Sequence, residues 1–481
     1  MSASRFAPLL GALWALWALP STAADFQVTN LADSNPPPAG SLRAAVQAAN
    51  ASPGPDRILF AIDGTVALAA GEIVITDAVE IRGRGRSANQ IDGLDASRIF
   101  RIDGDINNVG AVNVTMRALT LTHGNSGIDG GGAVAVLDFA KARIEDCVVW
   151  NSRTNASGGA VYAYQSQLDV VASTLTDNHA DDVGGGIAAE ESELLVDRST
   201  LRANASSFGG AIGATGVTTA VHLFGSRIES NTSANLGGGL ALTISAVDIS
   251  GVTLSGNSAD FAGGGAYLLG TATGSLVIQN STVSGNVVNH DGGRGSGVAL
   301  SEGTLWLRNS TVAYNRAPNA ANNDATLGGG VYVAEGGHTV NLVSTLVADN
   351  TRGAFNVPSE IARGIGIEGT LVSTINASHS LFRNVPEPGV LNGTDVADVI
   401  GADPLLLPLA DNGGPTPTHA LGTGSPACER GANPSGLATD QRGSGFSRGY
   451  GAVDIGAYEY RGDTIFFGDF ERHDPALFGC A

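Results

Sequence analysis

Basic residues are scarce in this sequence, and lysine is almost absent. The 481 residues include 26 Lys and Arg against 46 Asp and Glu, a formal net charge of −20, and Lys141 is the single lysine. A surface of this sign repels phosphate backbones and anionic lipid headgroups. Nucleic acids and anionic membranes are therefore excluded as partners, while the acidity suits solubility or cation binding.

Cysteine is also rare, with only Cys147, Cys428 and Cys480. No C-x-x-C pair and no cluster of His and Cys occurs, so we expect neither a disulfide framework nor a zinc site, and no metal ligands are assigned. Cys147 lies in a predicted strand and is expected to be a small buried apolar residue. Cys428 and Cys480 leave two alternatives open: free thiols, or a disulfide that ties down the C-terminal tail in an oxidising compartment.

After residue 24, no apolar run approaches the length that a membrane-spanning helix needs. The first residues show a different pattern, with Arg5, an apolar run from Phe6 to Leu19, and small residues at 21–24. This order is typical of a secretory signal peptide cleaved near Ala24. We therefore expect residues 1–24 to be removed and the mature chain to be secreted, with attachment to the cell surface left open.

Glycine is abundant, with 67 residues, and much of it recurs as a cluster followed by a small or aliphatic residue. The clusters begin at 131, 158, 185, 209, 238, 264, 296 and 329, so successive spacings are 27, 27, 24, 29, 26, 32 and 33 residues. A period of about 27 residues indicates a solenoid in which each repeat is one coil. One elongated body is therefore expected, although the length alone suggests two or three compact domains.

Between the clusters, apolar residues alternate with polar ones, as at Leu168 and Val170 and at Leu305 and Leu307. Period-2 alternation over short β-branched runs predicts strands and excludes helical repeats. Equivalent strands stacked about 4.8 Å apart bury one continuous apolar core. The sequence therefore predicts an all-β fold, a single-stranded right-handed parallel β-helix.

An asparagine closes each repeat, in patterns close to S-T-[LV]-x-x-N. Side-chain amides at equivalent turns can hydrogen-bond along a stack, as they do in cross-β structure. We expect such a ladder from nine residues: Asn125, Asn151, Asn178, Asn204, Asn231, Asn257, Asn286, Asn315 and Asn350.

The N-terminal end of the stack is predicted to have a capping helix. Ser41 can N-cap a helix whose apolar residues from Leu42 to Ala49 share one face, and Pro53 follows its end. We expect this capping helix to lie over the first coil, because an open stack recruits other chains. The predicted organisation is a signal peptide at 1–24, an N-terminal cap and first coils at 25–80, β-helix repeats at 81–385, a C-terminal cap at 386–460 and a tail at 461–481.

Three features resemble bacterial surface proteins. Residues 28–60 resemble the CSLREA-type opening of exported β-helix proteins, although Gly40 stands in place of its cysteine. The glycine clusters and closing asparagines resemble the repeats of polymorphic outer membrane proteins, with Leu, Val or Ile in place of the usual Phe. The strings DNGGPTPTHAL at 411–421, TDQRG at 439 and GAVDIGAYEY at 451 resemble the choice-of-anchor Q domain.

These resemblances imply an exported, surface-associated or released protein, and the IFFGDFE stretch of the tail resembles a terminal motif of exported proteins in Gram-negative bacteria. They also imply the pectin lyase-like solenoid, which hosts pectate lyases, polygalacturonases and related polysaccharide enzymes. Fold alone does not decide activity. A glycosidase needs two carboxylates at a set separation, and a lyase needs a base beside a group that neutralises a uronate. Neither occurs here as a motif.

Two other candidate sites have simpler explanations. Asp181 and Asp182 align with turn positions of other coils and are interpreted as turn-forming residues. Residues 292–300 resemble a calcium-binding nonapeptide, but Ser296 occupies the place of a liganding Asp. Calcium remains an alternative, and no cofactor and no catalytic residue is assigned.

Two neighbouring repeats carry longer turns on the same side of the stack, at 287–297 and 316–328. Long loops on one side of a solenoid are where binding usually resides. Trp306 takes an outward position beside them and can stack on a sugar ring. The candidate binding rim comprises His290, Asp291, Arg294, Trp306, Arg316, Asn322, Asn323 and Asp324.

Our hypothesis from the sequence is a non-catalytic secreted or cell-surface protein, adhesin-like, that binds a glycan or another surface partner. An extracellular polysaccharide lyase or glycoside hydrolase with a divergent site on the long loops is the alternative. A structural filler without a specific ligand is a third. The missing acid/base motif favours the first hypothesis.

A disulfide between Cys428 and Cys480 gives one cross-linked peptide when the secreted chain is digested without reductant, and reduction splits it. Cys147 serves as the control, because it is expected to remain a free thiol. Closing a loop of about 50 residues is expected to add about 4 kcal/mol to the free energy of unfolding. Alkylation of both Cys428 and Cys480 before reduction contradicts the pairing.

Overall fold

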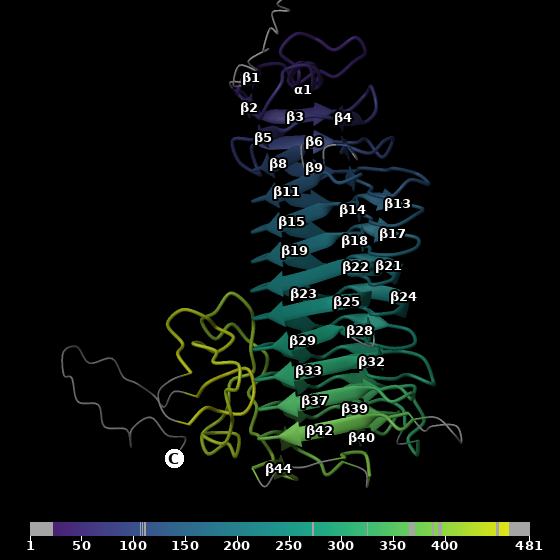
Figure 1. The fold of residues 1–481 in the computed structure, drawn as a ribbon, viewed down its shortest axis with the longest axis vertical. Coiled ribbons are helices and arrows are strands. Elements are labelled where there is room, and N and C mark those ends of the chain that lie inside the picture. Colours follow the sequence, from purple (N-terminus) through teal and green to yellow (C-terminus); the bar gives the residue numbers. More distant parts are fainter. Residues whose placement is uncertain are drawn as a thin grey trace, which may run out of the picture.

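The computed structural model describes residues 23–105, 107, 109, 112–271, 274–324, 326–364, 371–386, 389–392, 397–448 and 452–460. Across them the chain winds into stacked coils of parallel strands (Figure 1), which confirms the predicted all-β solenoid. Residues 1–22 and the tail at 461–481 lie outside the described residues, and Cys480 is among them. Signal-peptide cleavage and the pairing of Cys428 with Cys480 therefore stay predictions.

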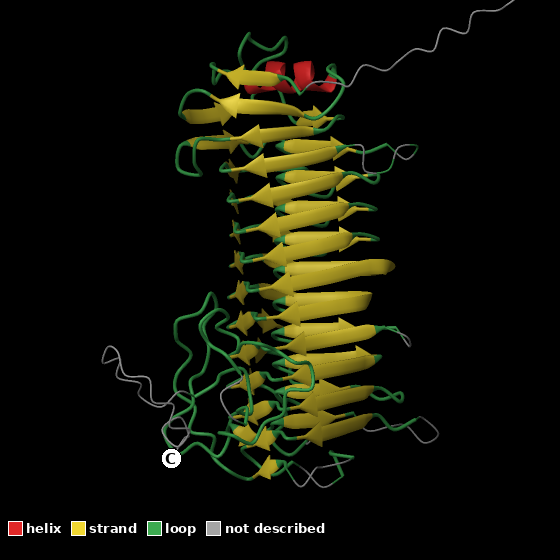
Figure 2. Ribbon diagram, turned by 60° about the vertical axis from the view of Figure 1, so that its left-hand side comes forward, coloured by secondary structure: helices red, strands yellow, loops and turns green. Residues whose placement is uncertain are grey.

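From β10 (Val134–Leu137) to β39 (Thr351–Arg352), each coil passes through four rows of strands in a constant order. In one coil these are β14 (Val161–Tyr164), β15 (Gln167–Val171), β16 (Thr174–Thr176) and β17 (His179–Ala180). Rows 1 and 2 form a 22-stranded sheet, row 3 a 13-stranded sheet and row 4 a 9-stranded sheet. Figure 2 shows the strands of each row lying one above the other.

The other strands of row 1 are β4 (Ile73–Ile75), β7 (Phe100–Asp103), β10 (Val134–Leu137), β18 (Ile187–Glu190), the first half of β22 (Ile212–Phe224), the first half of β25 (Leu240–Ser250), β28 (Ala266–Leu269), β32 (Val298–Glu302), β36 (Val331–Val333) and β41 (Ile361–Arg363). The others of row 2 are β1 (Asp25–Val28), β2 (Asp56–Phe60), β5 (Val79–Arg82), β8 (Asn113–Arg117), β11 (Lys141–Glu145), β19 (Glu193–Asp197), the second halves of β22 and β25, β29 (Ser275–Gln279), β33 (Thr304–Arg308), β37 (Thr339–Val343) and β42 (Thr374–Ser378).

The others of row 3 are β3 (Gly64–Ala67), β6 (Asn89–Asp92), β9 (Thr120–Thr122), β12 (Val148–Trp150), β20 (Thr200–Arg202), β23 (Arg227–Glu229), β26 (Thr253–Ser255), β30 (Thr282–Ser284), β34 (Thr311–Ala313), β38 (Leu346–Ala348), β43 (Leu381–Phe382) and β44 (Val399–Ile400). The others of row 4 are β13 (Arg153–Thr154), β21 (Ala205–Phe208), β24 (Thr232–Leu236), β27 (Ser258–Ala259), β31 (Val287–Val288), β35 (Arg316–Ala317), β39 (Thr351–Arg352) and β40 (Val357–Pro358).

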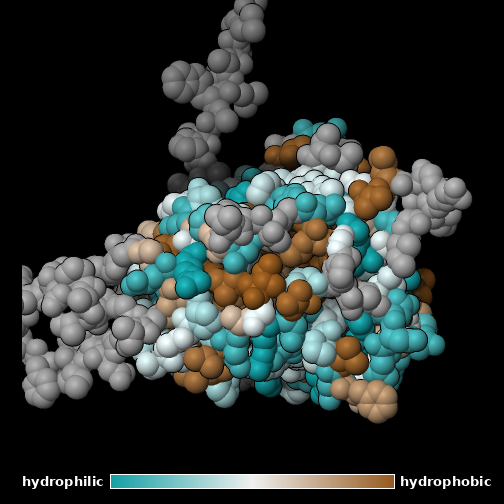
Figure 3. Space-filling view, turned by 90° about the horizontal axis from the view of Figure 1, so that it is seen from below, coloured by the Kyte–Doolittle hydropathy of each residue, from teal (hydrophilic) through white to brown (hydrophobic). Residues whose placement is uncertain are grey.

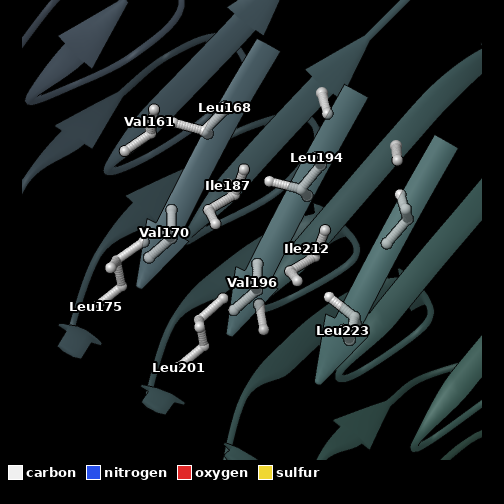
Figure 4. Close-up of a cluster of buried hydrophobic side chains, with 14 of the residues drawn as sticks. Val161, Leu168, Val170, Leu175, Ile187, Leu194, Val196, Leu201, Ile212 and Leu223 are labelled. Atoms are coloured by element: carbon white, nitrogen blue, oxygen red, sulfur yellow. The ribbon is translucent and has the colours of Figure 1, made fainter. Parts of the chain in front are cut away.

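The apolar core consists of columns of equivalent side chains. Because β15 pairs with β19 in parallel register, Leu168 lies next to Leu194 and Val170 next to Val196. All four side chains are fully buried, and Figure 4 shows them pointing into the interior between the rows. Full burial of such a side chain contributes about 1.5–3 kcal/mol. Every coil repeats this contribution.

Seven of the nine predicted asparagines form a continuous ladder, from Asn178 to Asn350. In each step the Nδ2 amide donates to the Oδ1 of the next asparagine, at 2.9–3.0 Å. The ladder ends where Asn350 Nδ2 donates to Glu360 Oε2 at 2.8 Å. The amide-to-amide bonds therefore all run toward the C-terminal end of the stack, where a carboxylate accepts the last one. The same Nδ2 groups also donate to carbonyl oxygens of the preceding coil, as Asn178 does to Val149.

The prediction was wrong for Asn125 and Asn151. The position equivalent to Asn178 one coil earlier is Ser152, whose backbone N–H donates to Asn178 Oδ1 at 3.0 Å. Asn151 is exposed, with a positive φ of 51°. Asn125 Nδ2 donates instead to the carbonyl oxygen of Asp95 at 2.9 Å. Both asparagines lie in the turn of their coil but are one residue away from the ladder position.

The helix α1 (Leu42–Asn50) lies across the first coils, at the top of Figure 1. Ser41 is its N-cap, and the hydroxyl oxygen accepts the N–H of Ala44 at 3.2 Å. Its apolar face from Leu42 to Ala49 is buried. Arg43, also on the buried side, pairs with Asp33 at 2.7 Å. The predicted capping helix is therefore present.

Most of the region that we expected to cover the far end of the stack lies beside it instead, while Val390 packs on the core and strand β44 pairs with β43 at that end. Residues 402–460, which we name the lateral segment, run back along the outside of row 3 (Figure 1). Gln441 Nε2 donates to Thr253 Oγ1 at 2.8 Å, and Arg448 Nη2 donates to Asn280 Oδ1 at 2.8 Å. The strings TDQRG and GAVDIGAYEY thus belong to a docked layer.

The far end of the stack keeps apolar surface among the described residues. Val385 is 74% exposed and Ile400 is 40% exposed. Figure 3, which views the molecule from this end, shows apolar surface there. A stack ends in this way when its last coil has no equivalent coil to pack against.

Asn257→Ala is expected to lower the free energy of unfolding by about 2–3 kcal/mol, because it leaves the buried N–H of Asn231 without an acceptor. Asn257 Oδ1 accepts that N–H at 3.0 Å. Chemical unfolding followed by circular dichroism measures the change. The exposed Asn323→Ala is the matched control and is expected to change the value by less than about 0.5 kcal/mol. An equal loss in both variants contradicts a stabilising ladder.

Candidate functional site

One outward-facing column of row 1 consists of small residues interrupted by tyrosines. Successive side chains of a strand point to opposite faces, so the neighbours of the core residues face outward. Parallel register aligns these positions from coil to coil: Ala135, Tyr162, Ala188, Gly213, Ala241, Tyr267, Ala299, Tyr332 and Ala362. A small residue between two tyrosines leaves a hollow in the surface.

The hollow between Tyr267 and Tyr332 has a volume of about 380 Å³, and we name it the Arg294 hollow. Its floor comes from row 1, and its wall comes from the turns that lead from row 4 back to row 1. It is lined by Leu236, Phe261, Ala262, Tyr267, His290, Gly292, Arg294, Ala299, Leu300, Ser301, Tyr332 and Ala334.

Two stacked pairs shape this hollow. The ring centroids of Phe261 and His290 are 4.4 Å apart, with an angle of 29° between the planes. The guanidinium carbon of Arg294 lies 5.7 Å from the ring centroid of Tyr332. Phe261 is 43% exposed, so its ring is available to a ligand. The hollow therefore presents aromatic surface and one cation to solvent.

The backbone holds Arg294 in place from both sides. It forms parallel bridges with Ala262 of the preceding coil and Gly328 of the following coil. The next residue, Gly295, has a φ of 56°, and a Cβ at this position would lie 2.7 Å from the carbonyl oxygen of Val298. Only glycine fits such a turn without strain. The base of the Arg294 side chain is therefore held rigidly at the edge of the hollow.

Arg294 has no carboxylate within 4.0 Å among the residues that the structure describes. The described lining of the hollow also contains no Asp or Glu. Burial raises the pKa of the Tyr332 hydroxyl, and the charge of Arg294 opposes this rise. The hydroxyl is therefore neutral at pH 7. Arg294 is therefore the one permanently charged side chain in the described lining, on a protein whose total charge is −20.

A second hollow, of about 420 Å³, surrounds Tyr162 earlier in the same column. Its arginines already have acidic partners. Arg98 Nη1 lies 2.8 Å from Glu72 Oε2, and Arg101 Nε lies 2.7 Å from Asp103 Oδ1. Because these charges are compensated within the protein, this hollow is less suited to an anionic ligand than the Arg294 hollow.

The structure brings together only part of the predicted rim. His290 and Arg294 line the hollow. Asp291, with a side chain that is 85% exposed, lies beside it and approaches His290 Nδ1 to 2.8 Å. Trp306 points outward, but it lies in row 2 under the guanidinium of Arg308, at 4.5 Å, and does not line the hollow.

The second long turn, at 316–328, folds around a small apolar core of its own. Asp324 Oδ1 accepts the hydroxyl of Thr326 at 2.6 Å, so this carboxylate forms the turn. Asn322 Oδ1 accepts a backbone N–H of the next coil at 3.3 Å. Arg316 and Asn323 are exposed and lie outside the hollow. These four residues therefore do not share one site with Arg294.

Sequence reasoning missed three aromatic residues, Phe261, Tyr267 and Tyr332. When the repeats are aligned on their glycine pairs, GGAY at 264–267 is matched with GGAV at 131–134. This alignment gives Tyr267 the same position as Val134, which is a core residue. In the structure Ala266 takes that core column and Tyr267 faces outward. The alternation of Ala266, Tyr267 and Leu268 was the available signal, since it places the tyrosine on the outer face.

Two further features concern metal binding and membrane crossing. Across the described ranges, no group of three or more His, Cys, Asp or Glu side chains is placed to hold a metal ion. In the same part of the chain, no helix combines the length and the apolar character that crossing a bilayer requires.

Comparison with known proteins agrees with the coil architecture. A family model described as a right handed beta helix region matches residues 105–287. No curated protein matches this sequence. Among solved structures, a PL6 alginate lyase in complex with a trisaccharide is similar, with 15% identity, coverage of 79% of this chain and 84% of the lyase, and a TM-score of 0.43.

Two further solved structures are similar at the same level. The pectate lyase Pel9A has 15% identity, coverage of 92% of this chain and 97% of the lyase, and a TM-score of 0.38. The A-module of the mannuronan C-5 epimerase AlgE6 from Azotobacter vinelandii has 15% identity, coverage of 69% of this chain and 92% of the module, and a TM-score of 0.35.

Proposed function

We propose that this protein is a secreted or cell-surface binder of an acidic glycan, that it is non-catalytic toward this glycan, and that the Arg294 hollow holds one sugar of the glycan chain. The observation that carries the proposal is the guanidinium of Arg294, which lacks a carboxylate partner among the described residues and lies over the ring of Tyr332. Guanidinium groups bind carboxylates in a bidentate manner, and aromatic rings contact the apolar faces of sugars. A uronic acid offers both a carboxylate and a ring face.

The outward column beyond Tyr267 is covered by the neighbouring turns. It continues toward the N-terminal end through Ala241, Gly213 and Ala188. A Cβ at Gly213 would lie 2.1 Å from Val183 Cγ1, so the Val183 side chain fills the space above that strand. The contact that we propose is therefore confined to one sugar in the hollow. Charges are screened beyond about 8 Å at physiological ionic strength, so the net charge of −20 does not prevent this local contact.

His290 favours a second candidate function, a polysaccharide lyase. Its imidazole lines the same hollow as Arg294, and a lyase combines a base with a group that neutralises the uronate carboxylate. A glycoside hydrolase has less support, because the described lining of the hollow offers no pair of carboxylates.

Arg294→Ala is expected to weaken binding to immobilised acidic polysaccharides, such as alginate or pectate, by about 10- to 100-fold. The variant loses hydrogen bonds to a charged group, which contribute about 1.5–3 kcal/mol. Arg316→Ala removes an exposed arginine from the neighbouring turn, outside the hollow, and is the matched control. Affinity electrophoresis of residues 25–481 and both variants measures the change. Equal retention of the two variants contradicts the proposal.

The same polysaccharides distinguish binding from lyase activity. A binder leaves the absorbance of unsaturated products unchanged during prolonged incubation with the wild-type protein. If product forms and His290→Ala abolishes it, the protein is a lyase and the non-catalytic assignment is wrong. If neither retention nor product is found with any acidic polysaccharide, both candidate functions fail.

A further inference from the structure

The lateral segment brings a histidine onto a serine of the coil stack. His419 lies in the string PTPTHAL, and Ser284 ends strand β30, 135 residues earlier in the chain. His419 Nε2 and Ser284 Oγ are 2.8 Å apart. On the other side of the ring, His419 Nδ1 lies 2.7 Å from the carbonyl oxygen of Leu407. A carbonyl oxygen can only accept, so the proton of the neutral ring is on Nδ1, and Nε2 accepts the hydroxyl of Ser284.

This is the arrangement of an activated nucleophile, in which a hydroxyl donates to a base that a third group orients. Burial lowers the pKa of His419, and the Leu407 carbonyl and the charge of Asp349 oppose the shift. The imidazole is therefore neutral at pH 7 and able to accept the serine proton. The ring of Tyr314 packs against it, with centroids 5.1 Å apart, and fixes its orientation.

Both residues of this pair line a hollow of about 600 Å³ between row 3 and the lateral segment. One side of it is apolar, with Leu406, Pro408 and Leu409, and suits a short uncharged acyl group. Gly256 and Gly285 follow the two serines of the other side and add no side chain that narrows it. Glu229 on the rim disfavours an acyl group that carries a negative charge.

Ser255 supplies a candidate donor for the developing oxyanion. It is the register partner of Ser284, so the two side chains leave the same face of adjacent strands, about 4.8 Å apart. Its hydroxyl has no hydrogen-bond partner in the part of the chain that the structure describes. It is therefore available to a ligand that is attacked by Ser284.

The geometry points to a second, catalytic site in which Ser284 and His419 hydrolyse an ester of a short, uncharged acyl group. Ser284 Oγ attacks the ester carbonyl carbon while its proton passes to His419 Nε2. The C–O bond to the alcohol then breaks, and Nε2 returns the proton to the leaving alcohol. Water next attacks the acyl-serine and transfers a proton to Nε2. The bond between the acyl carbon and Ser284 Oγ then breaks, Nε2 returns the proton to Oγ, and the carboxylic acid leaves.

Reaction of the full-length secreted chain with a fluorophosphonate probe tests this site, with peptide mass spectrometry to locate the label. We expect the label on Ser284, and hydrolysis of p-nitrophenyl acetate that falls to the rate of buffer in Ser284→Ala and His419→Gln. Ser255→Ala is expected to lower the rate about 100-fold, as the loss of one oxyanion donor does elsewhere. Ser444→Ala removes an exposed serine hydroxyl of the lateral segment, outside this hollow, and is the matched control, with wild-type rate.

The pH profile separates a base from a docking contact. Because burial lowers the pKa of His419, the acidic limb of the rate profile is expected below pH 6.5, the ordinary value for histidine. A wild-type chain that is not labelled on Ser284 while circular dichroism shows it folded overturns the proposal, and so does hydrolysis that persists in Ser284→Ala. In either case the pair only docks the lateral segment. The result is independent of glycan retention at the Arg294 hollow.

Discussion

Parallel register between successive coils is the constraint on which the rest of this structure depends. Each backbone hydrogen bond between coils places a residue directly beside its equivalent, so every position of the repeat becomes a column along the stack. Inward columns must be apolar, and the turn column must satisfy its polar groups from coil to coil. The asparagine ladder does this with one amide per coil, and Glu360 terminates it: its carboxylate accepts the last N–H of Asn350. Burial raises the pKa of Glu360, which Asn384 and Asn350 oppose through their hydrogen bonds.

The same register decides what could be predicted from the sequence. Core columns and seven ladder positions repeat with the same residue types, so periodicity alone located them. Asn125 and Asn151 were misplaced because Gly124 and Ser152 occupy the ladder column in those coils. Asn151 precedes this position by one residue and Asn125 follows it by one, so both resemble the pattern. Tyr267 was missed for a related reason: a one-residue shift relative to the glycine pair moves a side chain from the core to the surface.

The periodicity of the sequence could not predict contacts between segments that are far apart in the chain. The lateral segment has no repeat and, in its described part, no strand longer than a single bridge. Its position depends on individual side chains such as Gln441, which is 2% exposed and bonds to Thr253 Oγ1 at 2.8 Å. The sequence around Gln441 contains no pattern that predicts a contact with Thr253. The string TDQRG resembled a known domain, but only the structure shows that its glutamine docks the segment onto row 3.

The outer columns explain why the two candidate sites lie where they do. A regular coil presents short strands and tight turns, and its outer face is nearly flat. Row 1 departs from this at the Arg294 hollow, where a longer turn places His290 and Arg294 beside the small residue Ala299. Row 3 departs from it only where the lateral segment covers the strands and sets His419 over Ser284. In a solenoid the stack holds equivalent residues at fixed positions along its axis. Both candidate sites form where a segment that is not part of the repeat, a long turn or the lateral segment, packs against these positions.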